Sequence, residues 1–334
     1  MRARTAYRVR IIIGVTIAAG TVGGLFGLRI GSSLVTTIDG IATGAAIGFI
    51  LVLLEQLLRG RATATLRRLP MLAVLGLRTV LYSAVFVFGT AAGEGLVRLA
   101  LPRAPFSGLD IFAAGNLAIF VVASLAFNFA FVLRGMLGGR MLIALLTGRY
   151  HRPRQEKRIV LFADLHGSTE LAERLGDARF LRFLNRVVFD LTDAVLEAGG
   201  EIYRYVGDEV IVTWRHADRA SALAALGCVL VIEDTLARRR GDYLGAFGAA
   251  PQLRAALHAG PVIVDEIGDF KREIAILGDT MNTTARIEEA CRARGRNFIA
   301  SQAVLCRLSA LPPGITAEPL GTMALRGNPS LIKS

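Results

Sequence analysis

The sequence predicts a membrane α-helical bundle of about four transmembrane helices, followed by an α+β domain with a ferredoxin-like βαββαβ core. Hydrophobic residues make up 53% of the 334 residues, and the mean hydropathy is +0.50. Both values are high for a soluble protein. Long apolar runs fill the first 133 residues, and short strands alternating with amphipathic helices begin after Arg158. The chain therefore divides into a membrane half and a globular half.

The charge distribution changes at the same place. Residues 1–158 contain 19 basic and 5 acidic residues, whereas residues 159–334 contain 20 and 22. Because the whole basic excess lies beside the apolar runs, it is interpreted as the positive flanks that orient membrane helices. We therefore expect a lipid bilayer as a partner, and no nucleic acid.

Four apolar stretches approach the ~20 residues that a helix needs to cross a bilayer. They cover about residues 9–28, 38–58, 71–93 and 109–133, which gives a transmembrane domain at 1–133. Arginines cluster before the first stretch, between the second and third, and after the fourth. The positive-inside rule then predicts a multi-pass protein of the cell (inner) membrane, with the N-terminus and the C-terminal half in the cytoplasm.

Small and ionisable residues interrupt these stretches. Glycines at four-residue spacing allow close helix approach, either between the first two spans or in a dimer; they are Gly20, Gly24, Gly27, Gly31, Gly40, Gly44 and Gly48. Glu55 and Arg78 lie where an ionisable group is costly and often functional. Arg78 has the alternative of extending its guanidinium to the cytoplasmic interface.

A connector at 134–157 links the two halves. Its centre is too short to span a bilayer and is typical of a juxtamembrane coupling helix. Pro153 is expected to end that helix before the next strand begins.

The globular half, 158–334, shows regular alternation of elements. We expect strands at 159–163, 201–206, 210–214, 253–258, 262–267 and 274–277, and helices at 180–198, 217–240 and 280–294. This order begins βαββαβ, which brings the end of the first strand beside the hairpin between the second and third. Asp164 and Asp208 stand at those two turns and are therefore expected to face one another.

Two carboxylates at adjacent turns of an apolar sheet indicate a site for two divalent cations. Gly167, Ser168 and Thr169 form a corner that opens a helix, whose free N–H groups suit a phosphate. Each residue has a simpler interpretation when taken alone: Asp208 as a hairpin turn residue and Ser168 as a helix N-cap.

A third segment, "AILGDTMNTTARIEEACR" at 275–292, adds an amide and a guanidinium. Asn282 and Arg286 are four residues apart, so their side chains emerge from one helix face. Near a helix N-terminus, this pair suits a ribose and a phosphate. The segment alone would equally fit a surface helix with a solvated arginine.

Together these segments resemble the class III nucleotidyl cyclases, the family of adenylyl and guanylyl cyclases. The resemblance covers about residues 157–327 and is carried by "FADLHGST", "YRYVGDEVIV", "ILGDTMNTTAR" and "ALRG". It implies a membrane-bound adenylate cyclase, which is a lyase that acts in signal transduction. Such an enzyme converts ATP to 3′,5′-cyclic AMP and pyrophosphate. It also implies two Mg²⁺ or Mn²⁺ ions per active site, and a homodimer, because in this family the metal aspartates and the Asn/Arg helix come from different subunits.

The resemblance assigns a role to each matching residue. Metal binding falls to Asp164, Asp208 and the carbonyl of Leu165. Asn282 matches the residue that orients the ribose, and Arg286 matches the one that stabilises the transition-state phosphate. The β and γ phosphates are assigned to Arg326 and, as a weaker candidate, Lys271.

The two base-reading positions depart from the usual family pattern. Arg204 stands where a lysine commonly reads adenine, and Ala275 stands where an aspartate or threonine commonly accepts from the adenine amino group. An alanine side chain cannot hydrogen-bond a base. ATP is therefore preferred as substrate on family frequency, and a guanylate cyclase making cGMP is the nearest alternative.

Two further alternatives remain. "VGDEV" resembles the Gly-Gly-Asp/Glu-Glu-Phe hairpin of diguanylate cyclases, but Val206 and Val210 replace its first glycine and its phenylalanine. The other alternative is a membrane receptor whose cyclase module is degenerate and serves only for binding or dimerisation.

Overall fold

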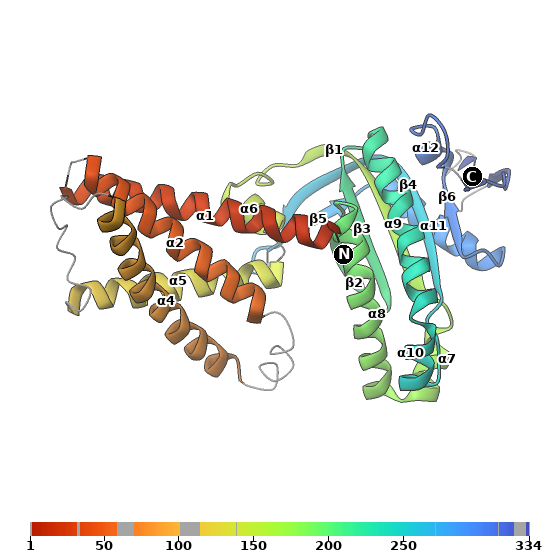
Figure 1. Cartoon of the computed structure of the whole chain (residues 1–334). Helices are drawn as coiled ribbons and strands as arrows, with labels where there is room; N and C mark the ends of the chain where they lie inside the picture. The colour runs from red at the N-terminus through yellow and green to blue at the C-terminus, as the bar shows by residue number, and fades with distance from the viewer. Residues whose placement is uncertain are drawn as a thin grey trace. The chain divides into compact units, whose positions relative to one another are not determined.

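The computed structural model describes residues 2–31, 34–58, 70–100, 114–137, 139–270, 272–312, 314–323 and 332–333. The chain forms two compact units, Met1–Ile143 and Ala144–Ser334. The first is helical and the second is a mixed α/β unit (Figure 1).

The first unit contains the apolar helices that the sequence predicts. They are α1 (Arg2–Gly31), α2 (Leu34–Leu58), α4 (Met71–Ala100) and α5 (Ala114–Leu137), and the short α6 (Gly139–Leu146) follows them. In α1, α2 and α4 the segments Ile11–Leu28, Leu34–Glu55 and Ala73–Ala92 are long and apolar enough to cross a membrane. A shorter apolar stretch, Val121–Ala130, lies in α5, and residues 109–113 of the predicted fourth span lie outside the described residues.

The glycine stripes bring α1 and α2 together. A Cβ atom at Gly44 would collide with the carbonyl oxygen of Ala19, and one at Gly40 would collide with that of Gly23. Only glycine lets the two backbones approach this closely. Of the two interpretations of the stripes, the structure shows packing between the first two spans.

Polar side chains join the helices of this unit in pairs. Glu55 is 4% exposed and accepts a hydrogen bond from Tyr82 Oη at 2.7 Å, while Arg78 Nη1 lies 3.7 Å from the same carboxylate oxygen. Arg78 therefore turns toward α2 and pairs with Glu55. Between α4 and α5, Ser83 Oγ donates to Ser124 Oγ at 3.2 Å. Such contacts hold apolar helices together where lipid gives no hydrophobic driving force.

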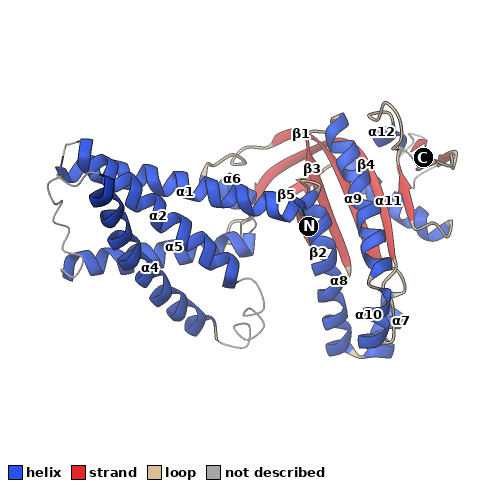
Figure 2. Ribbon diagram, viewed as in Figure 1, coloured by secondary structure: helices blue, strands red, loops and turns tan. Residues whose placement is uncertain are grey.

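The second unit is built on an antiparallel sheet, which Figure 2 shows in red. Its strands are β1 (Arg154–Leu165), β2 (Glu201–Val206), β3 (Glu209–Arg215), β4 (Leu253–Ile267), β5 (Glu273–Leu277) and β6 (Phe298–Ala300). The order is β2-β3-β1-β4-β5, and β6 pairs with β4 in parallel. With β1 between β3 and β4, the predicted βαββαβ core is confirmed. A second sheet pairs β7 (Thr322–Met323) with β8 (Ile332–Lys333).

Helices cover both faces of the large sheet. They are α7 (Ser168–Leu175), α8 (Asp177–Glu197), α9 (Arg219–Arg238), α10 (Arg240–Phe247), α11 (Asp279–Ala293) and α12 (Gln302–Leu305). Alternate residues of β1 point to opposite faces. Ile159 and Leu161 pack with residues of α8 and α9, whereas Val160 and Phe162 pack with residues of α11.

The composition of α9 alone would allow it to cross a membrane. The structure instead packs it into the core of the second unit, where Leu226, Val229 and Ile232 are buried. The apolar residues of α9 are therefore explained by contact with the sheet and α8.

Element boundaries differ from those expected at three main places. The strand expected at 159–163 is the longer β1, which begins at Arg154 and ends at Leu165. The strands expected at 253–258 and 262–267 form the single strand β4, in which Pro261 pairs with Lys157 of β1. Pairing with β5 begins only at Ile263, so the proline lies where one side of β4 has no neighbouring strand and its missing N–H costs nothing. The helix expected at 217–240 ends at Arg238, and the separate helix α10 follows it.

Candidate active site

The sheet places Asp164 and Asp208 side by side. Asp164 is the penultimate residue of β1, which pairs with β3 through Ala163 and Val210. Asp208 lies in the turn before β3, and Gly207 takes a left-handed conformation there, with φ of 63°. Burial and the neighbouring carboxylate of Asp208 raise the pKa of Asp164. The two acidic side chains thus share one small region at the end of the sheet.

One oxygen of this pair has no donor. Asp208 Oδ2 is buried, and no described residue hydrogen-bonds to it. A buried carboxylate oxygen without a partner is costly, and a cation would satisfy it. Leu165 ends β1 directly after Asp164, so its carbonyl lies at the same edge. These groups fit a divalent cation, which prefers oxygen ligands.

Arginines from two other elements approach Asp164, and sequence reasoning missed both. Arg254 lies directly opposite Asp164 in the β1–β4 register, and its Nη2 donates to Asp164 Oδ2 at 3.1 Å. Arg292 Nη2, on α11, lies 3.6 Å from the same oxygen. The strand register is the signal that would have found Arg254, and it depends on pairing between residues 90 positions apart.

Two more carboxylates complete an acidic cluster, which consists of Asp164, Asp208, Glu209 and Glu288. Burial, followed by Glu288, Asp164 and Asp208, raises the pKa of Glu209 to about 7. Burial and Asp164 also raise the pKa of Glu288, against the lowering effects of Arg292 and Arg254. The region is therefore crowded with negative charge and suits a positive ligand.

The corner at Gly167–Thr169 opens α7. Gly167 is left-handed with φ of 67°, a conformation that favours glycine. No side chain of the described chain caps α7, so its first-turn N–H groups remain available to an anion.

Asn282 and Arg286 project from α11. This helix begins after Gly278 and is held to β4 by Thr280 Oγ1, which donates to the carbonyl of Pro261 at 2.6 Å. Met281 and Ala285 pack on the sheet. Asn282 follows Met281 in the sequence, and Arg286 follows Ala285. Their side chains therefore project from the helix next to the face that packs on the sheet.

Asn282 and Arg286 lie in different environments within the chain. Asn282 is exposed, and Arg286 Nη1 is buried without a hydrogen-bond partner in the described part of the chain. Among the described residues, neither makes a hydrogen bond or ion pair with Asp164 or Asp208. Arg286 Nη1 therefore has donor capacity that the described residues do not use.

The positions predicted to read the base lie on β2 and β5, which are at opposite edges of the sheet but contact each other through side chains. Arg204 Nη2 donates to Glu273 Oε1 at 2.7 Å, and Tyr203 Oη accepts from the backbone N–H of Ile276 at 3.0 Å. Between these contacts, Ala275 is 2% exposed. Arg204 thus pairs with Glu273, a residue that sequence reasoning missed and that lies two positions before Ala275 on β5. Lys271 and Arg326 lie outside the described residues.

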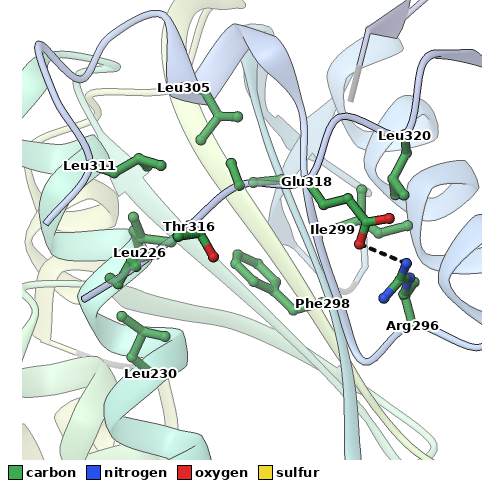
Figure 3. Close-up of a pocket in the computed structure, with 13 residues that line it drawn as sticks. Leu226, Leu230, Arg296, Phe298, Ile299, Leu305, Leu311, Thr316, Glu318 and Leu320 are labelled. Carbon is green, nitrogen blue, oxygen red and sulfur yellow. Dashed lines mark hydrogen bonds and ion pairs between the residues drawn. The ribbon is translucent and has the colours of Figure 1, made fainter. Parts of the chain in front are cut away.

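A pocket of about 300 Å³ lies elsewhere in the second unit. Its wall is mostly apolar and comes from α9, β6, α12 and the segment after α12 (Figure 3). Arg296 and Glu318 form an ion pair of 2.7 Å at this pocket. None of the predicted site residues lines it, so it is not the candidate active site.

A family of known proteins matches most of the second unit. The family described as the adenylate and guanylate cyclase catalytic domain matches residues 151–333. The chain is 43% identical over 202 residues to adenylate cyclase 2 of Rhizobium meliloti (strain 1021), covering 60% of this chain and 54% of the relative. It is 28% identical over 136 residues to human guanylate cyclase soluble subunit beta-2, covering 39% of this chain and 21% of that protein. The chain thus spans about half the length of the first of these relatives, and less of the second.

A solved structure of a bacterial light-regulated adenylyl cyclase is similar in fold. The TM-score is 0.56 at 21% sequence identity, and the match covers 70% of this chain and 66% of that chain.

Proposed function

The chain belongs to the family of adenylate and guanylate cyclase catalytic domains, and from that premise we propose that it is a membrane-bound adenylate cyclase. It would convert ATP to 3′,5′-cyclic AMP and pyrophosphate on the cytoplasmic side of the cell (inner) membrane. The observation that carries this proposal is the adjacent Asp164 and Asp208 with a buried, unpartnered oxygen at Asp208. The similarity to a named adenylate cyclase supports the choice of nucleotide.

Asp164, Asp208 and the carbonyl of Leu165 would hold two Mg²⁺ or Mn²⁺ ions. When bound, such ions supply positive charge that lowers the pKa of the ribose 3′-hydroxyl and neutralises the triphosphate. Among the described residues, no three His, Cys, Asp or Glu side chains converge with metal-binding geometry. Water and phosphate oxygens would therefore supply the remaining ligands.

The other site residues bind and orient the nucleotide. The amide of Asn282 would fix the ribose so that its 3′-oxygen is in line with the α-phosphorus. A bond forms between these two atoms, the bond from the α-phosphorus to pyrophosphate breaks, and the hydroxyl proton leaves to solvent. Arg286 would donate to the α-phosphate as its charge grows in the transition state. The amides at Gly167–Thr169, with Arg326 and Lys271, would bind the remaining phosphates.

The complete site would form between two copies of the chain. The acidic pair of one copy would face Asn282 and Arg286 of the other, which gives a homodimer with two equivalent sites. Among the described residues, Arg286 Nη1 has no hydrogen-bond partner, and Arg286 forms no ion pair with the acidic pair of its own chain; both observations support this arrangement. The catalytic unit would be 158–334, attached through 134–157 to the membrane domain at 1–133.

A guanylate cyclase is the second candidate, because the polar side chains at the predicted base site do not select adenine. Ala275 is buried and lacks a polar side chain, so Arg204 and Glu273 would define the polar surface that reads the base. This pair offers both a donor and an acceptor, which either purine could use.

The test is nucleotide turnover by purified full-length protein in detergent, with Mn²⁺ and either ATP or GTP. We expect the rate of cyclic AMP formation from ATP to exceed the rate of cyclic GMP formation from GTP. Asp208→Asn should abolish both activities. Faster turnover of GTP would overturn the choice of ATP. Absence of turnover of both nucleotides by the wild-type protein would instead identify a degenerate cyclase module.

A further inference from the structure

We propose that Arg254 is a positioning residue that holds Asp164 while the site lacks metal, and that its ion pair passes to Glu288 when Asp164 binds a cation. This inference rests on the proposed function, because it concerns the cation site of Asp164 and Asp208. It assigns a role to two buried charged residues, Arg254 and Glu288, to which the proposed function gives none.

The strand register fixes Arg254 at this site. Its cross-strand partner is Asp164, and the two side chains are joined by the 3.1 Å hydrogen bond from Nη2 to Oδ2. Arg254 is only 7% exposed. Its guanidinium cannot turn out to water, and a buried arginine needs an anionic partner at all times.

Glu288 is the alternative partner. Its Oε1 lies 3.6 Å from Arg254 Nε, which is too long for a good hydrogen bond. Both atoms are buried, and neither has a hydrogen-bond partner among the described residues. A shift of about 0.7 Å would close this gap to a charge-assisted hydrogen bond. The donor and the acceptor for a second Arg254 pairing are therefore already in place.

The two partners act at different times. A divalent cation and a guanidinium repel one another when they share the carboxylate oxygen Asp164 Oδ2. Arg254 would therefore move its hydrogen bonding to Glu288 as Asp164 turns to the cation. Without a negative charge at 288, Arg254 would stay on Asp164 and compete with the cation.

Glu288 also connects this exchange to α11. It lies two residues after Arg286 on the same helix. A stronger ion pair between Arg254 and Glu288 would therefore act on α11, the helix that carries Asn282 and Arg286.

Arg292 supplies the matched control. It is close to the same Asp164 oxygen, at 3.6 Å, but its side chain is 65% exposed. Removing Arg292 changes the net charge of the cluster by the same amount as removing Arg254. Solvent screens Arg292, however, and its removal leaves the buried competitor Arg254 in place.

The experiment measures Mn²⁺ binding to detergent-solubilised full-length protein without nucleotide, from the electron paramagnetic resonance signal of free Mn²⁺. Binding that Asp208→Asn removes defines the site. We expect Glu288→Gln to weaken this binding about tenfold. Adding Arg254→Gln to Glu288→Gln should restore the affinity to about that of the wild type, whereas adding Arg292→Gln should not. Arg254→Met serves as a second variant in the Glu288→Gln background, with circular dichroism to check folding.

Three outcomes would overturn the inference. Unchanged Mn²⁺ affinity in Glu288→Gln would show that Glu288 is not the alternative partner. Equal rescue by Arg254→Gln and Arg292→Gln would show that net charge alone controls affinity. A wild-type protein with no Asp208-dependent Mn²⁺ binding would overturn the metal site of the proposed function as well, which separates that failure from the other two.

Discussion

Charged side chains inside this protein have partners from distant parts of the sequence. Asp164 pairs with Arg254 across two strands, and Glu55 accepts from Tyr82 across two helices. A buried charge is tolerated only with such a partner, because desolvation costs more than most other single interactions supply. The buried groups that lack a partner among the described residues, such as Asp208 Oδ2 and Arg286 Nη1, are therefore the ones to test for ligand binding.

At the same scale, Arg286→Ala tests the assignment of the transition-state residue. We expect kcat to fall about 10²–10³-fold with little change in KM, because the guanidinium would act where charge develops in the transition state. The measurement is steady-state ATP turnover. Arg294→Ala is the control, since Arg294 ends the same helix and donates to the carbonyl of Leu320. A similar loss in both variants would indicate damage to α11 and not loss of catalysis.

His258 predicts a pH dependence of stability. Burial lowers the pKa of His258 from 6.5 to about 4, with Arg307 adding to this effect and Asp279 opposing it. The unfolded chain therefore binds a proton that the folded chain does not between these two values. The contribution of His258 to the free energy of unfolding is therefore complete above pH 6.5. It is lost as the pH falls toward 4, which lowers the free energy of unfolding by up to about 3 kcal/mol.

The chain contains its own probe for this measurement. Trp214 is the single tryptophan in the sequence and is buried in the second unit, so its fluorescence in urea reports the unfolding of that unit. His258→Gln should flatten the fall in stability between pH 6.5 and 4. An unchanged slope in the variant would assign the effect to other groups.

Among the elements, α1 and α2 depend on their glycines. Gly44→Val should destabilise the first unit by about 1–3 kcal/mol, because the new side chain would collide with the carbonyl of Ala19. The readout is the temperature at which half of the detergent-solubilised protein leaves the monodisperse peak in size exclusion. Gly14→Val is the control, since no heavy atom lies within 4 Å of its added Cβ. Equal losses in the two variants would contradict the assigned role of the close contact.

The start of α11 depends on a second close approach. A Cβ at Gly260 would collide with Thr280 Oγ1, the atom that ties α11 to β4. We expect Gly260→Ala to displace the helix and lower kcat at least tenfold, while the urea unfolding of Trp214 shows a folded protein. Retention of full activity would mean that the position of α11 is not set by this contact.

For the whole molecule, the property to test is the proposed division of the site between two copies. We expect chains carrying Asp208→Asn and chains carrying Arg286→Ala to be inactive when expressed separately. When they are co-expressed, random pairing would place one intact site in half of the dimers and recover about a quarter of the wild-type activity. Absence of recovery, with dimers present in size exclusion, would place Asp164, Asp208, Asn282 and Arg286 together in a site within one chain.

Much of the fold follows from local patterns in the sequence. Apolar runs in the first 133 residues predicted the helices α1, α2, α4 and α5, and alternating periods predicted the strands and helices after Arg158. The main errors arose at Pro261, which lies inside the single strand β4, and at the end of α9. Pro261 was misjudged because the absence of a neighbouring strand on one side of β4 is a property of the sheet and not of the local sequence.

The sequence predicted only part of the candidate site. Asp164, Asp208, Asn282 and Arg286 were found because their motifs and spacings are local, and their catalytic roles stay predictions. Arg254, Glu288, Arg292 and Glu273 were missed. Arg254 reaches Asp164 through the register of β1 and β4, and Glu273 reaches Arg204 across the ends of β2 and β5.

The sequence by itself determined the two-part architecture and the βαββαβ order of the core elements, and it predicted which residues would bind metal and phosphate. These properties depend on composition and on spacings of a few residues, which the chain carries before it folds. Only the tertiary structure decided that the glycine stripes join α1 to α2, that α9 is a core helix, and that Arg254 stands between Asp164 and Glu288. The physical reason is that each of these contacts joins separate elements, and sheet register and helix packing exist only in the folded chain.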